Sequence, residues 1–444
     1  MKKISIVGFG RFGKTLYKLL KDDFILTLYN RSGINRSGVE LNSNTAITDE
    51  IAKIYLSEAI FYAIPISAFE EVIRTHKKYF QNHHLLIDVL SVKLHPLKVF
   101  TKYLKNTRTQ ALLTHPMFGP DSSHYGFDGL PIIIDKFKTN EINYNFWKEF
   151  FQRKHLSVIE MSAREHDKMA ANSQGVTHFI GRLLKAFNFK ASSIDSLGTK
   201  KLLEVKDQTC NDTWELFMDL QHLNPYTKRM RLKLGKNYDK LYNKILPRQK
   251  DKHFITYGIQ GGKGSFNEEA ILYFLQRSGI TKYKIKYLYT AEKVLATLHG
   301  GDIDCGQFAI HNSVGGIVDE SIYAMAKYKF KIVNQFAVKI SHALMIRNDA
   351  NFSEITTIMT HPQVLAQCKT TLSQKYPHLK QTSGRGELID QSMVAKYLSE
   401  GKLPKTIATM GSKKLAQLFN LKVVEDNLQD AKENYTSFLM VTRI

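Results

Sequence analysis

The sequence predicts an α/β fold in three parts: a doubly wound parallel sheet, an all-helical region and a second α/β region. Over residues 1–161, short apolar runs alternate with helix-like stretches, and this alternation is typical of parallel sheets. Over 162–246, apolar residues recur at helical spacing while glycine and proline become rarer, which indicates an all-helical domain. The charged, proline-containing stretch 247–253 predicts a linker, and the strand–helix alternation resumes over 254–444.

The composition is that of an ordinary globular protein, apart from its charge. Of the 444 residues, 43% are apolar and 23% are charged, values that exclude a disordered chain. Lys and Arg number 63 against 41 Asp and Glu, a formal charge of +22. The basic residues are scattered rather than clustered, so we expect a surface that favours anionic small molecules over nucleic acid. A nucleic-acid-binding redox protein is an alternative that depends on the charge alone.

The cysteines and the apolar runs indicate the compartment. Cys210, Cys305 and Cys368 lie far apart and form neither a zinc-ligand spacing nor a disulfide framework. No apolar run approaches the roughly 20 residues that would span a bilayer. The first apolar run, 4–7, is too short for a signal peptide. We therefore expect a soluble cytoplasmic protein without a metal site.

A glycine motif follows the first expected strand and opens the first expected helix. In Gly8-Phe-Gly10-Arg11-Phe12-Gly13, the first glycine permits a tight turn, the second lets the backbone approach a pyrophosphate, and the third allows close helix–strand packing. The helix N-terminus offers backbone N–H groups to the anion. The motif predicts a Rossmann-type dinucleotide site.

The end of the second expected strand indicates which dinucleotide binds. An NAD site would place Asp or Glu there to accept a hydrogen bond from the ribose 2′-hydroxyl. This chain has Arg31 and Ser32 instead. Because a guanidinium attracts a 2′-phosphate that a carboxylate would repel, we predict NADP rather than NAD.

Polar motifs follow two later strands and open the helical region. Ser91 lies in Asp-Val-Leu-Ser-Val-Lys, His115 lies in Thr-His-Pro-Met-Phe-Gly-Pro, and His178 ends the segment that begins Arg164-Glu-His-Asp-Lys. Open α/β sheets bind ligands at the carboxyl ends of their strands. We therefore expect these three residues to face one another across a cleft.

These motifs resemble those of the prephenate and arogenate dehydrogenases, and the plant-type NADP-dependent arogenate dehydrogenases look most similar. The resemblance covers about residues 4–245 and implies a cyclohexadienol substrate that loses CO2 and a hydride and becomes aromatic. It implies that His115 accepts the hydroxyl proton, that Ser91 hydrogen-bonds the hydroxyl or the imidazole, and that His178 contacts the substrate. It also suggests a homodimer built on the helical domain. The sequence leaves open whether the substrate is prephenate or arogenate.

Two further residues of this half have weaker expected roles. Many bacterial members of the family bind the ring carboxylate with an arginine on a later helix, and no matching motif occurs here. Arg182, one helical turn after His178, is the expected substitute. His166 is expected to cap the start of its helix rather than to take part in the chemistry.

The second half contains another anion-friendly turn, Gly258-Ile-Gln-Gly-Gly-Lys-Gly-Ser265, ahead of an expected helix. With Gly-Gln-Phe-Ala-Ile-His-Asn312-Ser313 and Asn-Tyr-Thr436-Ser-Phe, it resembles the prephenate dehydratases over residues 254–443. The resemblance implies two α/β lobes, similar to periplasmic binding proteins, with the active site between them. It implies that Thr436 is catalytic and that Ser265, Asn312 and Ser313 line the cleft.

Two departures distinguish this half from the resembled family. Ser437 stands where the family usually has arginine, and His311 stands where it usually has glutamate. Loss of an arginine at a dicarboxylate site removes roughly 1.5–3 kcal/mol of charge-assisted hydrogen bonding, which Lys263 or Arg385 could replace. The chain ends soon after Thr436, so we expect no regulatory ACT domain and no phenylalanine inhibition through one.

These observations predict a bifunctional enzyme of aromatic amino acid biosynthesis, in which an NADP-dependent prephenate or arogenate dehydrogenase is fused to a prephenate dehydratase. The alternative is a dehydrogenase whose C-terminal half is a non-catalytic ligand-binding module.

Overall fold

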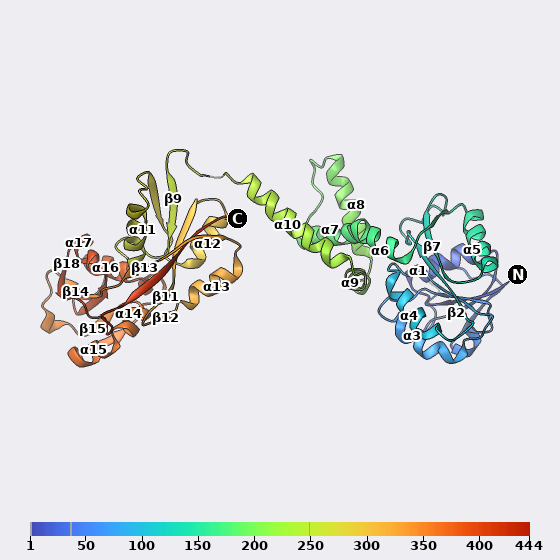
Figure 1. Cartoon of the computed structure of the whole chain (residues 1–444), viewed down its shortest axis with the longest axis horizontal. Helices are drawn as coiled ribbons and strands as arrows, with labels where there is room; N and C mark the ends of the chain where they lie inside the picture. The colour runs from blue at the N-terminus through green and yellow to red at the C-terminus, as the bar shows by residue number, and fades with distance from the viewer. Residues whose placement is uncertain (1, 36–37, 248) are drawn as a thin grey trace. The chain divides into compact units, whose positions relative to one another are not determined.

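The computed structural model describes residues 2–35, 38–247 and 249–444. They form two compact units that divide between Asn237 and Tyr238, inside helix α10 (Figure 1). Among the described residues, no helix is long and apolar enough to cross a membrane and no group of side chains could hold a metal ion. The finer boundaries at 161/162 and 247–253 remain predictions.

In the described part of the first unit, eight strands form one sheet in the order β3-β2-β1-β4-β5-β6-β7-β8. All neighbouring strands are parallel except β6 and β7. The strands are β1 (Lys3–Val7), β2 (Ile25–Tyr29), β3 (Thr45–Thr48), β4 (Ala59–Tyr62), β5 (Leu85–Asp88), β6 (Gln110–Pro116), β7 (Pro131–Lys138) and β8 (Ser157–Glu160). The helices between them are α1 (Arg11–Leu20), α2 (Ile51–Ile54), α3 (Phe69–His76), α4 (Leu94–Leu104) and α5 (Glu141–Arg153), with a 3-10 turn at Lys77–Tyr79.

This strand order confirms the predicted doubly wound sheet. The chain runs outward from β1 to β3 and then crosses back to β4 on the other side of β1. Such a reversal opens a crevice at the carboxyl ends of the two central strands, where α/β proteins bind ligands. Apolar side chains cover both faces of the sheet, and its central strands β1, β4, β5 and β6 are almost wholly buried.

The helical part follows as α6 (Ala163–Asn172), α7 (Gln174–Ala186), α8 (Leu197–Asn211), α9 (Trp214–Leu223) and α10 (Thr227–Ile245). Helices α7 and α8 pack closely because Gly181 has no side chain: a Cβ there would lie 1.9 Å from Thr209 Oγ1. Ser67 fastens α9 to the sheet domain, since its N–H and hydroxyl both donate to Asp219 Oδ2 at 2.9 Å.

The second unit has two α/β lobes, as the sequence predicts. The first lobe has a sheet in the order β10-β9-β11-β19-β13, with β12 beside β11, and the second has a sheet in the order β16-β15-β17-β14-β18. Strand β19 returns from the second lobe and inserts between β11 and β13. The chain therefore crosses between the lobes twice, which places the start of β19 at the junction of the lobes.

The first lobe contains β9 (Ile255–Ile259), α11 (Phe266–Arg277), β10 (Tyr283–Tyr287), α12 (Ala291–His299), β11 (Cys305–Asn312), β12 (Gly316–Ile317), α13 (Asp319–Lys327), β13 (Lys331–Lys339) and β19 (Tyr435–Thr442). The second contains β14 (Ala343–Arg347), β15 (Thr357–Met359), α14 (Pro362–Gln367), α15 (Lys369–Lys375), β16 (Lys380–Thr382), α16 (Gln391–Ser399), β17 (Ile407–Gly411), α17 (Lys414–Leu418) and β18 (Leu421–Glu425), with 3-10 turns at Phe352–Glu354 and Gly386–Ile389.

Candidate active sites

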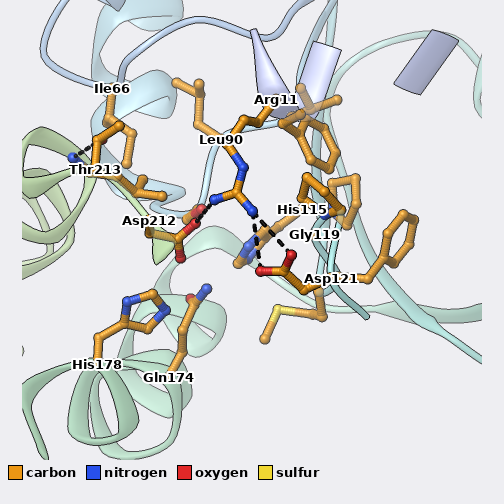
Figure 2. Close-up of a pocket in the computed structure, with 18 of the residues that line it drawn as sticks. Arg11, Ile66, Leu90, His115, Gly119, Asp121, Gln174, His178, Asp212 and Thr213 are labelled. Carbon is orange, nitrogen blue, oxygen red and sulfur yellow. Dashed lines mark hydrogen bonds and ion pairs between the residues drawn. The ribbon is translucent and has the colours of Figure 1, made fainter. Parts of the chain in front are cut away.

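A cavity of about 520 Å³ in the first unit brings together the residues that the sequence singles out. The glycine turn contributes Gly10, Arg11 and Phe12, and the strand ends contribute Ser91 and His115. Helix α7 adds His178, whose ring points toward the same space as Gln174 (Figure 2). The predicted cleft between the strand ends and the helical region is therefore present.

The glycine turn has the shape that a phosphate group needs. Gly8 has φ +97°, and a Cβ there would lie 2.2 Å from the carbonyl oxygen of Ala63. A Cβ on Gly13 would lie 2.2 Å from the carbonyl oxygen of Gly8, whereas a Cβ on Gly10 would meet nothing within 4 Å. The turn is thus packed against the protein at Gly8 and Gly13 and open at Gly10. Gly10 precedes α1 without a side-chain cap, so the turn fits a bound pyrophosphate.

Arg31 and Ser32 lie outside the lining of this cavity. Both side chains are exposed just after β2, the strand next to β1. Asn30 links this segment to the glycine turn, because its side chain donates to Ser32 Oγ at 3.0 Å and accepts from the Phe9 N–H at 3.2 Å. The segment continues into residues 36 and 37, which are outside the described part of the chain.

Arg11 spans the cavity between two carboxylates. Its guanidinium pairs with Asp121 at 3.1 Å and with Asp212 at 3.3 Å, and it donates to the Asn211 carbonyl at 2.8 Å (Figure 2). Burial raises the pKa of Asp212, and Arg11 acts against that rise. The first residue of α1 is thereby connected to the turn between α8 and α9.

His115 is 2% exposed and is backed by a second histidine. Its Nδ1 lies 2.7 Å from Nε2 of His166, whose Nδ1 in turn lies 2.9 Å from Oδ1 of Asp167. Burial lowers the pKa of His115 well below its ordinary value, and the neighbouring His166 and Lys93 lower it further. Because the neutral form is favoured, the imidazole is available to accept a proton.

The expected capping role of His166 is wrong. Ser162 is the residue before α6, its hydroxyl accepts from the Glu165 N–H, and Glu165 bonds back to the Ser162 N–H. This capping box leaves no role at the helix start for His166, which is buried against His115. The sequence signal was present in the Ser-x-x-Glu spacing that begins at Ser162.

A buried ion pair supports the segment that carries Ser91. Lys93 Nζ donates to Asp88 and to the Thr114 carbonyl, and both charged side chains have no exposed surface. Burial raises the pKa of Asp88 and lowers that of Lys93, while each partner favours the charged form of the other. Asp88 also accepts from the Leu90 N–H at 3.3 Å. The pair thereby fixes the loop that places Ser91 at the cavity wall.

His178 presents an unsatisfied nitrogen beside the cavity. Its ring is buried, and among the described residues its Nδ1 has no hydrogen-bond partner. Burial lowers its pKa to about 4. A neutral ring with an unpartnered nitrogen is suited to hydrogen-bonding a polar ligand.

Arg182 does not reach this cavity. Its guanidinium donates to the Asp212 carbonyl at 2.5 Å and lies 5.4 Å and 5.5 Å from the ring centres of Trp214 and Phe217. These contacts hold the turn between α8 and α9, so the geometry does not support Arg182 as the ligand of a ring carboxylate.

A second cavity, of about 580 Å³, lies between the two lobes of the second unit. Ser265 and Thr436 line it, as the sequence predicts. Ser265 also caps α11 by accepting from the Glu268 N–H. The lysines that line the cavity are Lys293 and Lys396, whereas Lys263 and Arg385, the expected replacements for the family's arginine, are outside its lining.

Asn312 lies directly behind Thr436 rather than in the cavity lining. Its Oδ1 accepts from the Val314 and Gly315 N–H groups at 2.9 and 2.7 Å, which fixes the orientation of the amide. Its Nδ2 therefore faces Thr436 and donates to Oγ1 at 2.9 Å. Because Oγ1 accepts this bond, the hydroxyl hydrogen of Thr436 stays free to donate elsewhere.

A chain of buried amides continues behind Asn312, and the sequence reasoning missed it. Asn434 accepts from Asn312 Nδ2 at 2.6 Å and donates to Gln367 Oε1 at 2.8 Å. His342 Nε2 lies 2.7 Å from the same Gln367 oxygen. Thr436 is thus held by neutral groups from both lobes.

Three other residues in or next to β11 and β19 lie away from this cavity. His311 and Ser437 are direct cross-strand partners, next to the pair formed by Asn312 and Thr436. Since successive side chains of a strand point to opposite faces, His311 and Ser437 face away from Thr436, and neither lines the cavity. Ser313, expected to line the cleft, instead bonds the backbone of Glu433 and Tyr435.

The fold and the two sites together define a nucleotide-binding α/β domain with a helical extension, followed by a two-lobed ligand-binding domain. Comparison with protein families agrees with this division. Residues 16–158 match the prephenate dehydrogenase nucleotide-binding domain, 183–254 match the TYRAAT1-like C-terminal domain, and 257–444 match prephenate dehydratase. The first unit is therefore similar to the prephenate dehydrogenase nucleotide-binding domain, and the second unit is similar to prephenate dehydratase.

Individual relatives each resemble one half of the chain. Arogenate dehydrogenase 2, chloroplastic, of Arabidopsis thaliana is 31% identical over 230 residues, which are 50% of this chain and 64% of the relative. The prephenate dehydratase of Methanocaldococcus jannaschii is 30% identical over 180 residues, 40% of this chain and 61% of the relative. The chain thus spans less than two thirds of either relative. A solved A. aeolicus prephenate dehydrogenase is 15% identical, with a TM-score of 0.44 over 63% of this chain and 96% of that one.

Proposed function

We propose that this chain catalyses two reactions of aromatic amino acid biosynthesis, one in each unit. The first unit oxidatively decarboxylates prephenate or arogenate, and the second dehydrates and decarboxylates prephenate to phenylpyruvate. One observation supports both assignments: each cavity has at its wall a side chain suited to proton transfer, His115 or Thr436, which buried partners orient.

In the first reaction, the residues of the chain orient the substrate and handle one proton. A bound nicotinamide dinucleotide supplies the hydride acceptor. His115 Nε2 takes the hydroxyl proton as the carbinol carbon loses its hydride. The ring carboxylate then leaves as CO2, its bond electrons make the ring aromatic, and the phenolic oxygen recovers a proton. Ser91 and His178 hydrogen-bond the substrate from the two walls of the cavity.

We propose NADP as this nucleotide. Arg31 follows the strand that lies next to the glycine turn, where the ribose of a dinucleotide lies in this fold. Its guanidinium can pair with a 2′-phosphate, and Ser32 can donate to the same group.

The charges around the first cavity favour the amino-bearing substrate, arogenate. Asp121, Asp212 and Glu215 line the cavity against one arginine, Arg11. Acidic groups at the cavity wall attract the side-chain ammonium of arogenate. They repel prephenate, a keto acid that lacks this positive charge.

In the second reaction, the difficult step is the departure of hydroxide, which must be protonated to leave as water. Thr436 Oγ1 accepts from Asn312 and can therefore direct its hydrogen toward the leaving oxygen. Lys293 and Lys396 line the same cavity and can pair with the substrate's carboxylates. The two departures from the family, His311 and Ser437, lie outside the cavity lining, which supports an active dehydratase over a ligand-binding module.

One experiment tests both assignments. Full-length protein is assayed with prephenate and with arogenate, each with NADP and with NAD, for nicotinamide reduction and for release of phenylpyruvate or phenylalanine. We expect both activities in wild type. Nicotinamide reduction without any dehydration product would support the alternative, a dehydrogenase with a C-terminal ligand-binding module; absence of both activities would refute the proposal.

We also propose a homodimer formed through the helical part of the first unit. Helices α7 and α8 and their connection expose large apolar side chains, Leu183, Phe187, Ile194, Leu197 and Leu202, and such a surface is costly to leave in water. Sedimentation of wild type and of Phe187→Glu tests this, with a monomer expected for the variant. The cytoplasmic location remains a prediction.

A further inference from the structure

The two residues behind His115 form an ordered chain of hydrogen bonds. His115, His166 and Asp167 are all nearly inaccessible to solvent, at 2%, 2% and 0% exposure. We propose that His166 and Asp167 are positioning residues that hold His115 in the tautomer whose Nε2 is unprotonated. This inference rests on the proposed dehydrogenase function, and it names the groups that make His115 a base at a defined atom.

The direction of these hydrogen bonds follows from Asp167, because its carboxylate can act only as an acceptor. Asp167 accepts from the Lys93 N–H at 2.8 Å and from the Leu94 N–H at 2.9 Å, at the start of α4. A carboxylate at a helix N-terminus is stabilised as the anion, and an anionic carboxylate can only accept hydrogen bonds.

The tautomers of His166 and His115 follow from the acceptor role of Asp167. His166 Nδ1 must carry the hydrogen that it donates to Asp167. A neutral imidazole then has an unprotonated Nε2, which can only accept from His115 Nδ1. His115 therefore keeps its own hydrogen on Nδ1, and its Nε2 has a free lone pair.

The hydrogen bonds from His115 to His166 and Asp167 also stabilise the positive charge that His115 gains during the reaction. When Nε2 takes the substrate proton, the Nδ1–H bond to His166 strengthens, and the positive charge is stabilised by Asp167 through His166. The charged and titratable groups that act on the two rings, apart from Asp167, are Lys93 from the segment after β5 and His178 from α7. Asp88, the last residue of β5, and Asp135 of β7 act in turn on Lys93. Lys93 opposes a cation on either ring, so the link to Asp167 is the favourable interaction that offsets it.

A purely structural role does not account for His166. The start of α6 is already satisfied by Ser162 and Glu165. Asp167 could satisfy the N–H groups of α4 without a histidine beside it. The one partner that requires His166 is His115.

The kinetic test compares two substitutions of His166 in the full-length protein. In His166→Phe, the His115 tautomer is no longer fixed, and we expect kcat for the oxidation to fall about 10²-fold with KM changed less than about threefold. The pH profile of kcat/KM should also shift, because the group that stabilises the His115 cation is lost. In His166→Gln, the amide oxygen can accept from His115 Nδ1, and we expect about tenfold of the lost kcat to return.

The matched control is His84→Gln, which alters a fully buried histidine bonded to the Tyr55 carbonyl and the Gln81 N–H. This variant should lower the thermal stability without changing kcat or the pH profile. If His166→Phe oxidises the substrate with the kcat and pH profile of wild type, the inference is overturned while the proposed function stands.

A measurement that needs no activity separates the inference from the proposed function. Nitrogen NMR of histidine-labelled protein reports which ring nitrogen is protonated, and the signals of His115 are those lost in His115→Asn. We expect a protonated Nδ1 and an unprotonated Nε2 in wild type. A protonated Nε2 would overturn the inference. If neither substrate is oxidised, the proposed function fails and the NMR result still decides the tautomer.

Discussion

The cavity of the first unit is backed by ionisable side chains, whereas the cavity of the second unit is backed mainly by amides. Behind His115 lie His166 and Asp167, with the Lys93–Asp88 pair close by. Behind Thr436 lie Asn312, Asn434 and Gln367. Both sets are buried and hydrogen-bonded, so the difference between them is one of charge rather than of burial.

This difference matches the two proton transfers that we propose. A group that accepts a proton becomes a cation, and a nearby carboxylate stabilises that cation inside the protein. A hydroxyl that donates a proton needs only a fixed orientation, which neutral amides supply without the cost of burying charge. The first site should therefore respond to pH and the second should not.

The largest expected effect is the separation of the two activities. His115→Asn should lower the oxidation by roughly 10²–10⁴-fold and leave dehydration unchanged, because only the first cavity loses its base. Thr436→Val should do the reverse. Each variant is the other's control for folding, and both activities are measured on the same preparation. A parallel loss of both activities in either variant would contradict two separate sites.

The second prediction concerns stability at acid pH. Burial lowers the pKa of His76 and His178 to about 4 and lowers that of His115 well below its ordinary value. The unfolded chain therefore binds more protons than the folded one between about pH 6.5 and 4, and stability present above about pH 6.5 is lost as the pH falls. The expected loss is on the order of a few kcal/mol.

Tryptophan fluorescence can follow this loss in the first unit alone. The chain's 2 tryptophans, Trp147 and Trp214, both belong to that unit. Urea midpoints measured by fluorescence should fall as the pH decreases, and His76→Gln should reduce the slope because one titrating group is removed. The second unit has fewer such histidines, His342 and His361, so its circular-dichroism transition should move less. A fluorescence midpoint that is constant over this pH range would count against the buried neutral histidines.

The third prediction concerns the cofactor. Arg31→Ala removes the guanidinium expected to pair with a 2′-phosphate, and the kcat/KM ratio of NADP to NAD should fall by roughly 10–100-fold, the value of one charge-assisted hydrogen-bonded pair. Dehydration should be unaffected. Arg153→Ala, a substitution at the last residue of α5, serves as the charge control. An unchanged cofactor ratio in Arg31→Ala would remove the basis for NADP.

The sequence predicted the parts of the sites that depend on chain order. The glycine turn and the strand-end residues Ser91 and His115 follow from the position of each residue after a strand, since parallel strands bring their carboxyl ends to one edge. Thr436 was found by its motif. These residues required no knowledge of which helix packs against which strand.

The parts that were missed depend on contacts between distant segments. His166 contacts His115 across 51 residues of sequence, and Asn312 contacts Asn434 across 122. Arg182 has the expected place on α7 after His178, but aromatic rings and carbonyls of the next helices hold its guanidinium. Local spacing places a side chain on a face of its helix and does not say which distant group meets it.

The fourth prediction has the smallest expected effect and concerns the two departures in the second unit. His311 and Ser437 are opposite each other across two strands, the positions where the family usually has glutamate and arginine. Glutamate and arginine at such positions would form a cross-strand ion pair, worth about 0.2–1 kcal/mol. The two departures therefore lie together, on the face turned away from Thr436. The double substitution His311→Glu with Ser437→Arg should change dehydration kcat/KM by less than about threefold, a factor that corresponds to well under 1 kcal/mol.

Lys293→Ala, at the wall of the cavity, should lower dehydration kcat/KM more than the double substitution does. A large gain of dehydratase activity in the Ser437→Arg chain would show instead that the missing arginine belongs to the substrate site.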